Sequence, residues 1–190
     1  MKKIMQISLF VLVTAMLLSS FTAVMAAPAK WIPVTATTIG KTAVFSGIVL
    51  NEGGVFFFDT AATGTVTFNT PSKVWTFASS SIQSGIINTK TDDGELHIKM
   101  TWTYPAVGTV QGTFEGEAKG KTTTYAYVPT TGIPHPFYST NIYHTVLQGS
   151  GIFDGQTLKL DGIRPSLDPA VYPPITGPKP TSWEGFLLAP

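Results

Sequence analysis

Apolar and polar residues alternate one by one along most of the chain beyond its N-terminal segment. From Leu96 to Tyr104 every second residue is apolar, and polar residues such as His97 and Lys99 fill the positions between them. Successive side chains of a strand point to opposite faces, so this pattern predicts a strand with one buried and one solvated face. Residues 110–118 and 158–161 repeat it. Beyond the N-terminal segment, no long stretch repeats apolar residues at the spacing of an α-helix. We therefore expect a nearly all-β protein.

Turn-forming residues interrupt the alternation at short intervals, for example at Gly40-Lys41, Ala62-Thr63-Gly64 and Lys119-Gly120-Lys121. They divide the chain into predicted strands near residues 31–39, 42–50, 54–59, 64–70, 73–78, 81–89, 95–104, 109–118, 121–128, 142–149, 151–153 with 156–162, and 182–188. Many short strands joined by short loops predict a single antiparallel up-and-down β-barrel, because closure removes exposed strand edges. A β-sandwich is the alternative.

The N-terminal segment, residues 1–26, has the pattern of a cleavable signal peptide. Two lysines follow the first methionine, an apolar run extends from Ile7 to Leu18, and small residues surround the predicted cleavage point after Ala26. An uncleaved membrane anchor is the alternative. Cleavage leaves residues 27–190 as a single all-β domain, in which no further segment is apolar and long enough to cross a membrane as a helix. We therefore expect a secreted or extracytoplasmic protein of the cell envelope.

Charge and cysteine content narrow the range of functions. The chain has 12 Lys and Arg against 11 Asp and Glu, and removal of Lys2 and Lys3 with the signal leaves 10 − 11 = −1. This balance argues against a nucleic-acid partner, which would require a basic surface. With no cysteine, disulfides, zinc–thiolate sites and a cysteine nucleophile are excluded. The oligomeric state stays open.

Two long proline-rich connections, 129–141 and 163–181, suggest where a ligand could bind. In a meander every second connection leaves the sheet at the same end, so these two and the connection at 105–108 are predicted to share one barrel mouth. Barrel mouths commonly bind small molecules. The predicted ligand-binding residues are Tyr104, His135, Phe137, Tyr138, Arg164 and Tyr172.

Catalytic and metal-binding motifs are not apparent in the sequence. The three histidines, His97, His135 and His144, lack the spacing of a metal site. Glu115 and Glu117 lie on one solvated strand face, whereas glycosidase carboxylates approach a sugar from opposite sides. We therefore predict no metal and no cofactor, and we assign no catalytic residue.

The C-terminal third carries a resemblance to a known group of barrels. The segments Leu147–Gly155 and Trp183–Phe186 combine glycines with single aromatic residues on strands. They resemble the late strands of small calycin-like barrels, in particular allene oxide cyclase-like and dirigent-like proteins. The resemblance implies a barrel that holds apolar ligands or steers reactive intermediates, and it transfers no catalytic residue to this chain.

Together these features predict an exported soluble barrel that binds a small apolar or aromatic ligand at one mouth. A cyclase or isomerase is an alternative, and it would require a polar group buried inside the barrel. A structural or adhesive protein of the cell envelope is a further alternative, in which the threonine-rich outer faces contact other chains.

Overall fold

The computed structural model describes the β-rich part of the chain. The described residues are 29–50, 55–88, 90–91, 93–124, 139–165 and 180–190. Contacts group Lys30–Ala189 into one compact unit. The predicted signal segment 1–26 lies outside the described residues.

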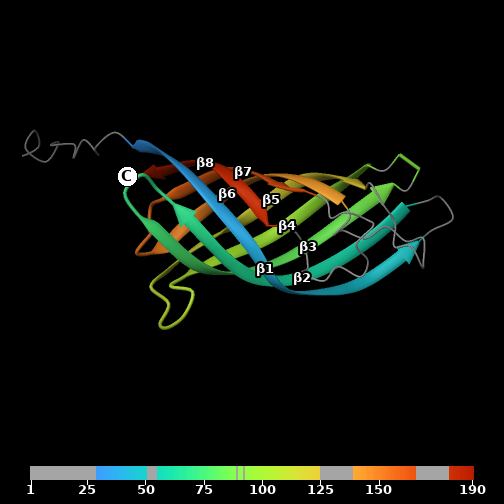
Figure 1. Ribbon diagram of the computed structural model, residues 1–190, viewed down its shortest axis with the longest axis horizontal. Coiled ribbons are helices and arrows are strands. Elements are labelled where there is room, and N and C mark those ends of the chain that lie inside the picture. The colour runs from blue at the N-terminus through green and yellow to red at the C-terminus, as the bar shows by residue number, and fades with distance from the viewer. Residues whose placement is uncertain (1–28, 51–54, 89, 92, 125–138, 166–179) are drawn as a thin grey trace, which may run out of the picture. The chain divides into compact units, whose positions relative to one another are not determined.

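Eight antiparallel strands form one closed barrel in which each strand pairs with its neighbours in the sequence (Figure 1). They are β1 (Lys30–Leu50), β2 (Val55–Asn69), β3 (Val74–Asn88), β4 (Asp93–Tyr104), β5 (Gly112–Thr124), β6 (Ser139–Gly151), β7 (Thr157–Arg164) and β8 (Thr181–Ala189). Pairing of β1 with β8 completes the circle. The predicted antiparallel up-and-down barrel is confirmed, and the sandwich alternative is wrong.

Several strands are longer than the sequence pattern predicts. β1, β2, β3 and β5 each join two predicted strands, and the expected turn at Lys119–Lys121 lies within β5. A Cβ atom on Gly120 would lie 2.5 Å from the carbonyl oxygen of Ile142 and 2.8 Å from Cδ1 of Tyr143. Gly120 therefore allows a close approach between two strands, which is a usual role of glycine inside a sheet.

Glycines and large side chains alternate along one row of cross-strand partners inside the barrel. The row takes one residue from each strand. In the order β2, β3, β4, β5, β6, β7, β8 and β1, these are Phe58, Gly85, Leu96, Gly120, Tyr143, Gly162, Trp183 and Ala36. The Trp183 ring covers Gly162, and it stacks on the Tyr143 ring at a centroid distance of 5.6 Å. Each glycine makes room for the large neighbour on the adjacent strand.

The strands are strongly staggered around the barrel. A path along cross-strand partners from Ala36 returns to β1 between Ser46 and Val49, at least 10 residues (46 − 36) further along. Such a stagger tilts the strands and widens an eight-stranded barrel. β1 pairs with β8 through Lys30–Thr38, and among the described residues Ile39–Leu50 pairs with β2 alone.

Aromatic side chains fill one end of the barrel, which we call the aromatic end. Phe68, Phe77, Trp102 and Phe114 are each at most 2% exposed. Phe153, in the turn between β6 and β7, packs on Phe114 at a centroid distance of 4.8 Å. Aromatic rings in tilted or edge contact fill volume efficiently, so the protein's own side chains close this end.

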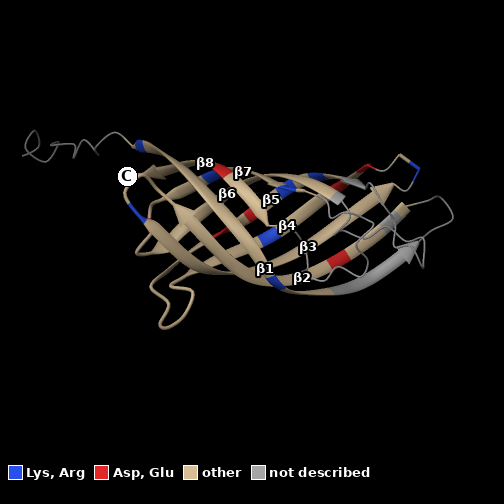
Figure 2. Cartoon of the chain, in the orientation of Figure 1, with Lys and Arg blue, Asp and Glu red and all other residues tan. Residues whose placement is uncertain are grey.

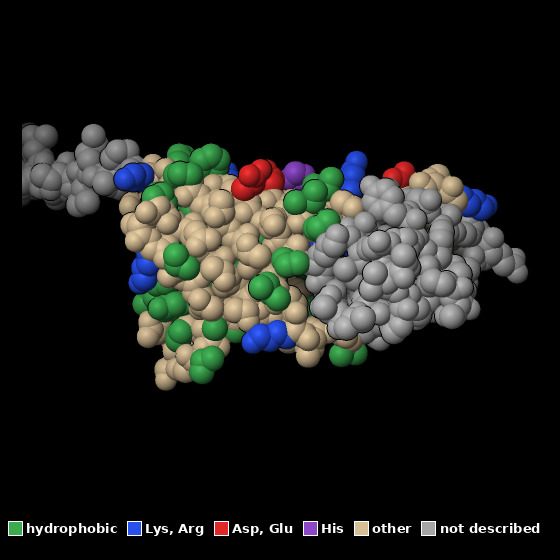
Figure 3. Space-filling model, viewed as in Figure 1, with side chains coloured by type: hydrophobic (Ala, Val, Ile, Leu, Met, Phe, Trp, Pro, Cys, Tyr) green, Lys and Arg blue, Asp and Glu red, His purple; other side chains and the backbone are tan. Residues whose placement is uncertain are grey.

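Charged residues of both signs are spread along the strands of the barrel (Figure 2). One outward-facing row of cross-strand partners contains His97, Lys119, His144, Asp161 and Glu184. His144 Nδ1 lies 2.5 Å from Asp161 Oδ1 on an exposed surface, where such a pair adds little stability. On the visible face apolar side chains are scattered among polar ones (Figure 3). No helix able to cross a membrane occurs in the described part of the chain.

Replacing Gly120 with alanine tests whether this glycine serves close strand packing. Gly120→Ala should lower the free energy of unfolding by about 1–3 kcal/mol, because the added methyl group meets the Ile142 backbone and the Tyr143 ring. Urea unfolding followed by tryptophan fluorescence measures the change. The matched control, Lys119→Ala on the outer face of the same strand, should stay within about 0.5 kcal/mol of the parent protein. Equal effects of the two variants would contradict this role of Gly120.

Candidate functional site

Buried polar residues gather on the inner wall at the barrel end opposite the aromatic end. Thr122 on β5, Asn141 on β6 and Arg164 on β7 are cross-strand partners in one row. Tyr143 lies two residues beyond Asn141 on the same face of β6. Asn141 and Thr122 are almost fully buried, and Arg164 is half-buried. We call these four residues the polar cluster.

Asn141 is the centre of the polar cluster. In the amide orientation that suits its neighbours, Oδ1 accepts hydrogen bonds from Arg164 Nη2, from Arg164 Nε at 3.2 Å and from the Tyr143 hydroxyl at 3.0 Å. Its Nδ2 donates to Thr122 Oγ1 at 2.5 Å and to the carbonyl oxygen of Thr140 at 3.2 Å. Orientation of a buried amide follows from such a network. Both amide atoms of Asn141 are thus satisfied inside the barrel.

The polar cluster contains one cationic group and no acidic group. Arginine stays protonated throughout the physiological pH range, and its guanidinium presents five N–H donors in a rigid fork. Asn141 contacts this fork through its amide oxygen, and that contact holds the guanidinium against the inner wall.

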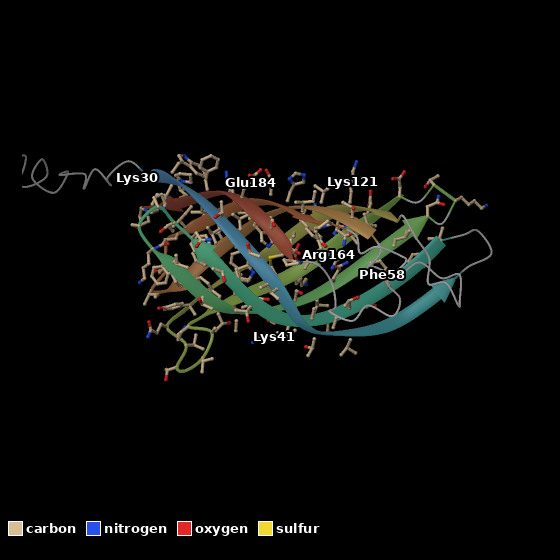
Figure 4. All side chains as sticks on the ribbon, viewed as in Figure 1. Lys30, Lys41, Phe58, Lys121, Arg164 and Glu184 are labelled. Atoms are coloured by element: carbon tan, nitrogen blue, oxygen red, sulfur yellow. The ribbon has the colours of Figure 1, made fainter. Side chains whose placement is uncertain are left out.

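The wall that faces the polar cluster is largely apolar, with Thr60 and its cross-strand partner Gln83 as polar members. Phe58 on β2, Ile87 on β3, and Leu96 and Ile98 on β4 are buried on the inner face. Figure 4 labels Arg164 and Phe58, which come from well-separated strands of the barrel. This end of the barrel therefore combines an apolar wall with a polar one, whereas the aromatic end is apolar on all sides.

Other polar groups on the inner face differ in whether they have a hydrogen-bond partner. The Trp183 indole Nε1 donates to Thr38 Oγ1 at 2.9 Å, and Thr145 Oγ1 donates to the carbonyl oxygen of Glu117 at 3.0 Å. Thr60 Oγ1 on β2 is buried and has no hydrogen-bond partner among the residues that the structure describes. A buried hydroxyl without a partner is unusual and calls for an explanation.

Two of the six predicted ligand-binding residues lie in the described part of the chain, and they occupy opposite ends of the barrel. Arg164 belongs to the polar cluster. Tyr104 ends β4 at the aromatic end, where its ring lies 5.0 Å from that of Trp75 and 5.5 Å from that of Phe77. The remaining four, His135, Phe137, Tyr138 and Tyr172, lie outside the described residues.

The predicted clustering of three connections at one mouth is correct for two of them and wrong for the third. The strand ends joined by 129–141 and by 163–181 lie at the same end, because Thr122, Asn141 and Arg164 are partners. The connection at 105–108 leaves β4 at the aromatic end. The predicted turn at Lys119–Lys121 divides β5 into two strands. Because successive strands run in opposite directions, this extra strand reverses the expected direction of every strand after it.

The sequence analysis did not identify Thr122, Asn141 and Tyr143. On β6 the usual polarity is reversed, since Asn141 and Tyr143 face inward while Ile142 and Val146 face outward with nearly half of their surface exposed. A hydrophobic pattern read on this strand alone assigns the faces wrongly. Buried Leu147 on the face of Asn141, and exposed His144 and Gln148 on the other face, are the local signals of the true direction.

Among the described residues, no group of three or more His, Asp or Glu side chains is arranged to hold a metal ion. Comparison with family models, with curated proteins and with solved structures gives no match. The resemblance to calycin-like barrels therefore stays a prediction, and the functional argument depends on the geometry of this chain alone.

The hydroxyl of Tyr143 provides a direct test of the polar cluster. Tyr143→Phe removes one hydrogen bond to Asn141 and keeps the ring that stacks on Trp183. It should lower the free energy of unfolding by about 0.5–1.5 kcal/mol. Tyr104→Phe is the matched control, since the Tyr104 hydroxyl has no hydrogen-bond partner among the described residues, and it should be nearly neutral. Urea denaturation compares the two, and an equal or larger loss for Tyr104→Phe would argue against the described network.

Proposed function

We propose that this protein is exported and binds a small, mainly apolar or aromatic molecule inside the barrel at the end that carries the polar cluster. The observation that supports this most is that buried Asn141 and Thr122 and half-buried Arg164 share one inner wall while the facing wall is largely apolar. Ligand sites typically combine an apolar lining with a few well-placed polar groups.

The contrast between the two barrel ends supports the proposal. An apolar core needs no polar side chains, and burying a charged or amide group costs free energy unless its hydrogen bonds are satisfied. The aromatic end follows this rule with Phe68, Phe77 and Phe114. The other end departs from it at three adjacent strands, and such departures are commonest at functional sites.

The way in which the barrel holds these groups also suits binding. Thr122, Asn141 and Arg164 project from strands of a closed sheet, and hydrogen bonds to Asn141 orient their side chains. Groups that are already oriented before the ligand arrives lose little conformational entropy on binding. Affinity then depends mainly on the match between the ligand and the two walls.

A cyclase or isomerase is the second candidate, and the polar cluster is the observation that favours it. Such an enzyme needs polar groups held inside an apolar barrel, and the hydroxyl of Tyr143 and the guanidinium of Arg164 converge on one oxygen atom there. Incubation of the protein with its recovered ligand separates the two candidates. Unchanged ligand supports binding alone, and an isomer of the same mass supports catalysis.

Narrowing the interior should abolish binding. Ala62 and Ala61 are neighbours on β2 that point to the inner and the outer face, respectively. Ala62→Phe should remove the molecule that native mass spectrometry detects on protein purified from its source, because the phenyl ring projects from the inner face of β2 toward the proposed site. Ala61→Phe adds the same ring outside and should retain the molecule.

Circular dichroism and thermal unfolding check that both variants keep the barrel. Retention of the molecule by Ala62→Phe, or its loss from both folded variants, would place the binding region elsewhere. Failure to detect any bound molecule on the parent protein, together with no binding of neutral or anionic aromatic probes, would count against the proposed function itself.

A further inference from the structure

We infer that the molecule bound by the barrel carries an uncharged polar group, best matched by a carboxamide, which Gln83 holds together with Thr60 and Ser81 on the inner face of β2 and β3. We call these three residues the neutral patch. The inference rests on the proposed function, since it specifies the chemistry of a ligand in the same interior. It draws on polar side chains at adjacent inward-facing positions, and on a buried hydroxyl among them that has no partner in the described part of the chain.

The neutral patch interrupts the apolar lining of β2 and β3. Ser81 and Gln83 are successive inward-facing residues of β3, and both are half-buried. Gln83 pairs directly with Thr60 on β2 and with Ile98 on β4. Placing amide and hydroxyl groups on the inner face costs free energy unless they form hydrogen bonds. Such a departure from the alternating pattern is commonest at functional sites.

The polar groups of Thr60 and Gln83 are neighbours without being bonded to each other. Thr60 is 9% exposed, and its Oγ1 has no hydrogen-bond partner among the residues that the structure describes. The amide of Gln83, although it belongs to the direct cross-strand partner, therefore does not satisfy this hydroxyl. A polar ligand group that reached this pair would bond to both side chains at once.

The surroundings of the neutral patch favour an uncharged group. Among the described residues, the inner faces of β2, β3 and β4 carry no charged side chain. An ion held against these strands would lose its hydration without gaining an opposite charge there, and that cost is large. A neutral polar group needs only hydrogen bonds to replace those that it made with water.

The chemistry of the Gln83 side chain matches a carboxamide. A glutamine amide presents an acceptor, Oε1, beside a donor, Nε2. A ligand carboxamide presents the same two functions, so two hydrogen bonds can form between the pair. The hydroxyl groups of Thr60 and Ser81 can each donate or accept, and they suit the remaining donor or lone pair of the ligand. A ketone has an acceptor alone and leaves Oε1 without a donor.

The stagger of the barrel brings the neutral patch to the height of the polar cluster. Followed through cross-strand partners, the row of Asn141 reaches β3 at Ile87, by way of Thr122 and Gly94. A stagger of at least 10 residues (46 − 36) around eight strands amounts to about four residues over these three steps. Gln83 lies four residues (87 − 83) from Ile87 in the direction of the aromatic end. The neutral patch and Asn141 therefore face the same part of the interior from different walls.

Two probes of nearly the same shape test the match on the full chain, namely 2-naphthamide and 2-acetonaphthone. Both have a naphthalene body and one carbonyl group, and the NH₂ of the amide is a methyl group in the ketone. Isothermal titration calorimetry measures the two dissociation constants. We call the dissociation constant of the ketone divided by that of the amide the amide preference. This ratio removes the contribution of the shared aromatic body.

Gln83→Met replaces the amide by an apolar group of similar length. It should lower the amide preference about 3- to 10-fold, which is the range for a neutral hydrogen bond. Gln148→Met is the matched control, because it makes the same substitution on the exposed outer face of β6 and should leave the amide preference unchanged. Thermal unfolding confirms that both variants fold.

Thr60→Val is nearly isosteric and provides a second variant. It should also lower the amide preference, by about 3-fold, and it should be at least as stable as the parent because it no longer buries an unpartnered hydroxyl. A different result is expected if Gln83 turns toward Thr60 in the empty protein and the two form a structural pair. Thr60→Val and Gln83→Met would then each destabilise the protein with effects that do not add, and neither would change the amide preference. That result overturns the inference.

The remaining outcomes separate this inference from the proposed function. An amide preference that is equal in the parent, in Gln83→Met and in Gln148→Met overturns the inference and leaves ligand binding intact. Recovery of a native ligand without any uncharged polar group does the same, whereas a ligand with an uncharged group that both donates and accepts hydrogen bonds supports the inference. Absence of any bound molecule, together with no binding of either probe, overturns both.

Discussion

Close packing of large side chains over glycines is the contact on which this barrel depends. Eight staggered strands leave an interior that side chains must fill, and the inner row from Phe58 to Ala36 does so by pairing each of three glycines with a bulky neighbour. Trp183 lies over Gly162 and Tyr143 over Gly120, so adjacent strands approach closely at these glycines. The same row lies directly beneath the polar cluster, so this packing also sets the position of Asn141 and Arg164.

The two ends of the barrel differ in how much their buried side chains contribute to stability. The aromatic end buries Phe68, Phe77 and Phe114 and supplies hydrophobic stabilisation. With this end filled by its own side chains, the opposite end can carry polar groups that contribute less to folding. The Asn141 network limits their cost, because its hydrogen bonds satisfy both amide atoms. Among the described residues, Thr60 is the exception, because its buried hydroxyl has no hydrogen-bond partner.

Tyr143 links stability with the proposed function. Its ring belongs to the packed row through contact with Trp183, while its hydroxyl belongs to the polar cluster through Asn141. Tyr143, a residue of the packed row, thus holds Asn141, a residue of the proposed site. In this way a closed sheet can keep a binding group oriented before the ligand arrives. Arg164, at the end of β7, is less buried than Asn141.

Local alternation, as between Leu96 and Tyr104, was enough to predict strands and a closed antiparallel barrel, because the two-residue period is a property of each strand by itself. The position of Arg164 at a barrel end followed from the same pattern. The number and direction of the strands could not be predicted from this pattern. The sequence around Gly120 looks the same whether this glycine forms a turn or lies beneath Tyr143 inside a strand. Only the neighbouring strand decides between these roles. The inward-facing polar side chains of β6 depended likewise on tertiary structure, because the closed sheet, and not the hydrophobicity of the strand, selects which face is buried.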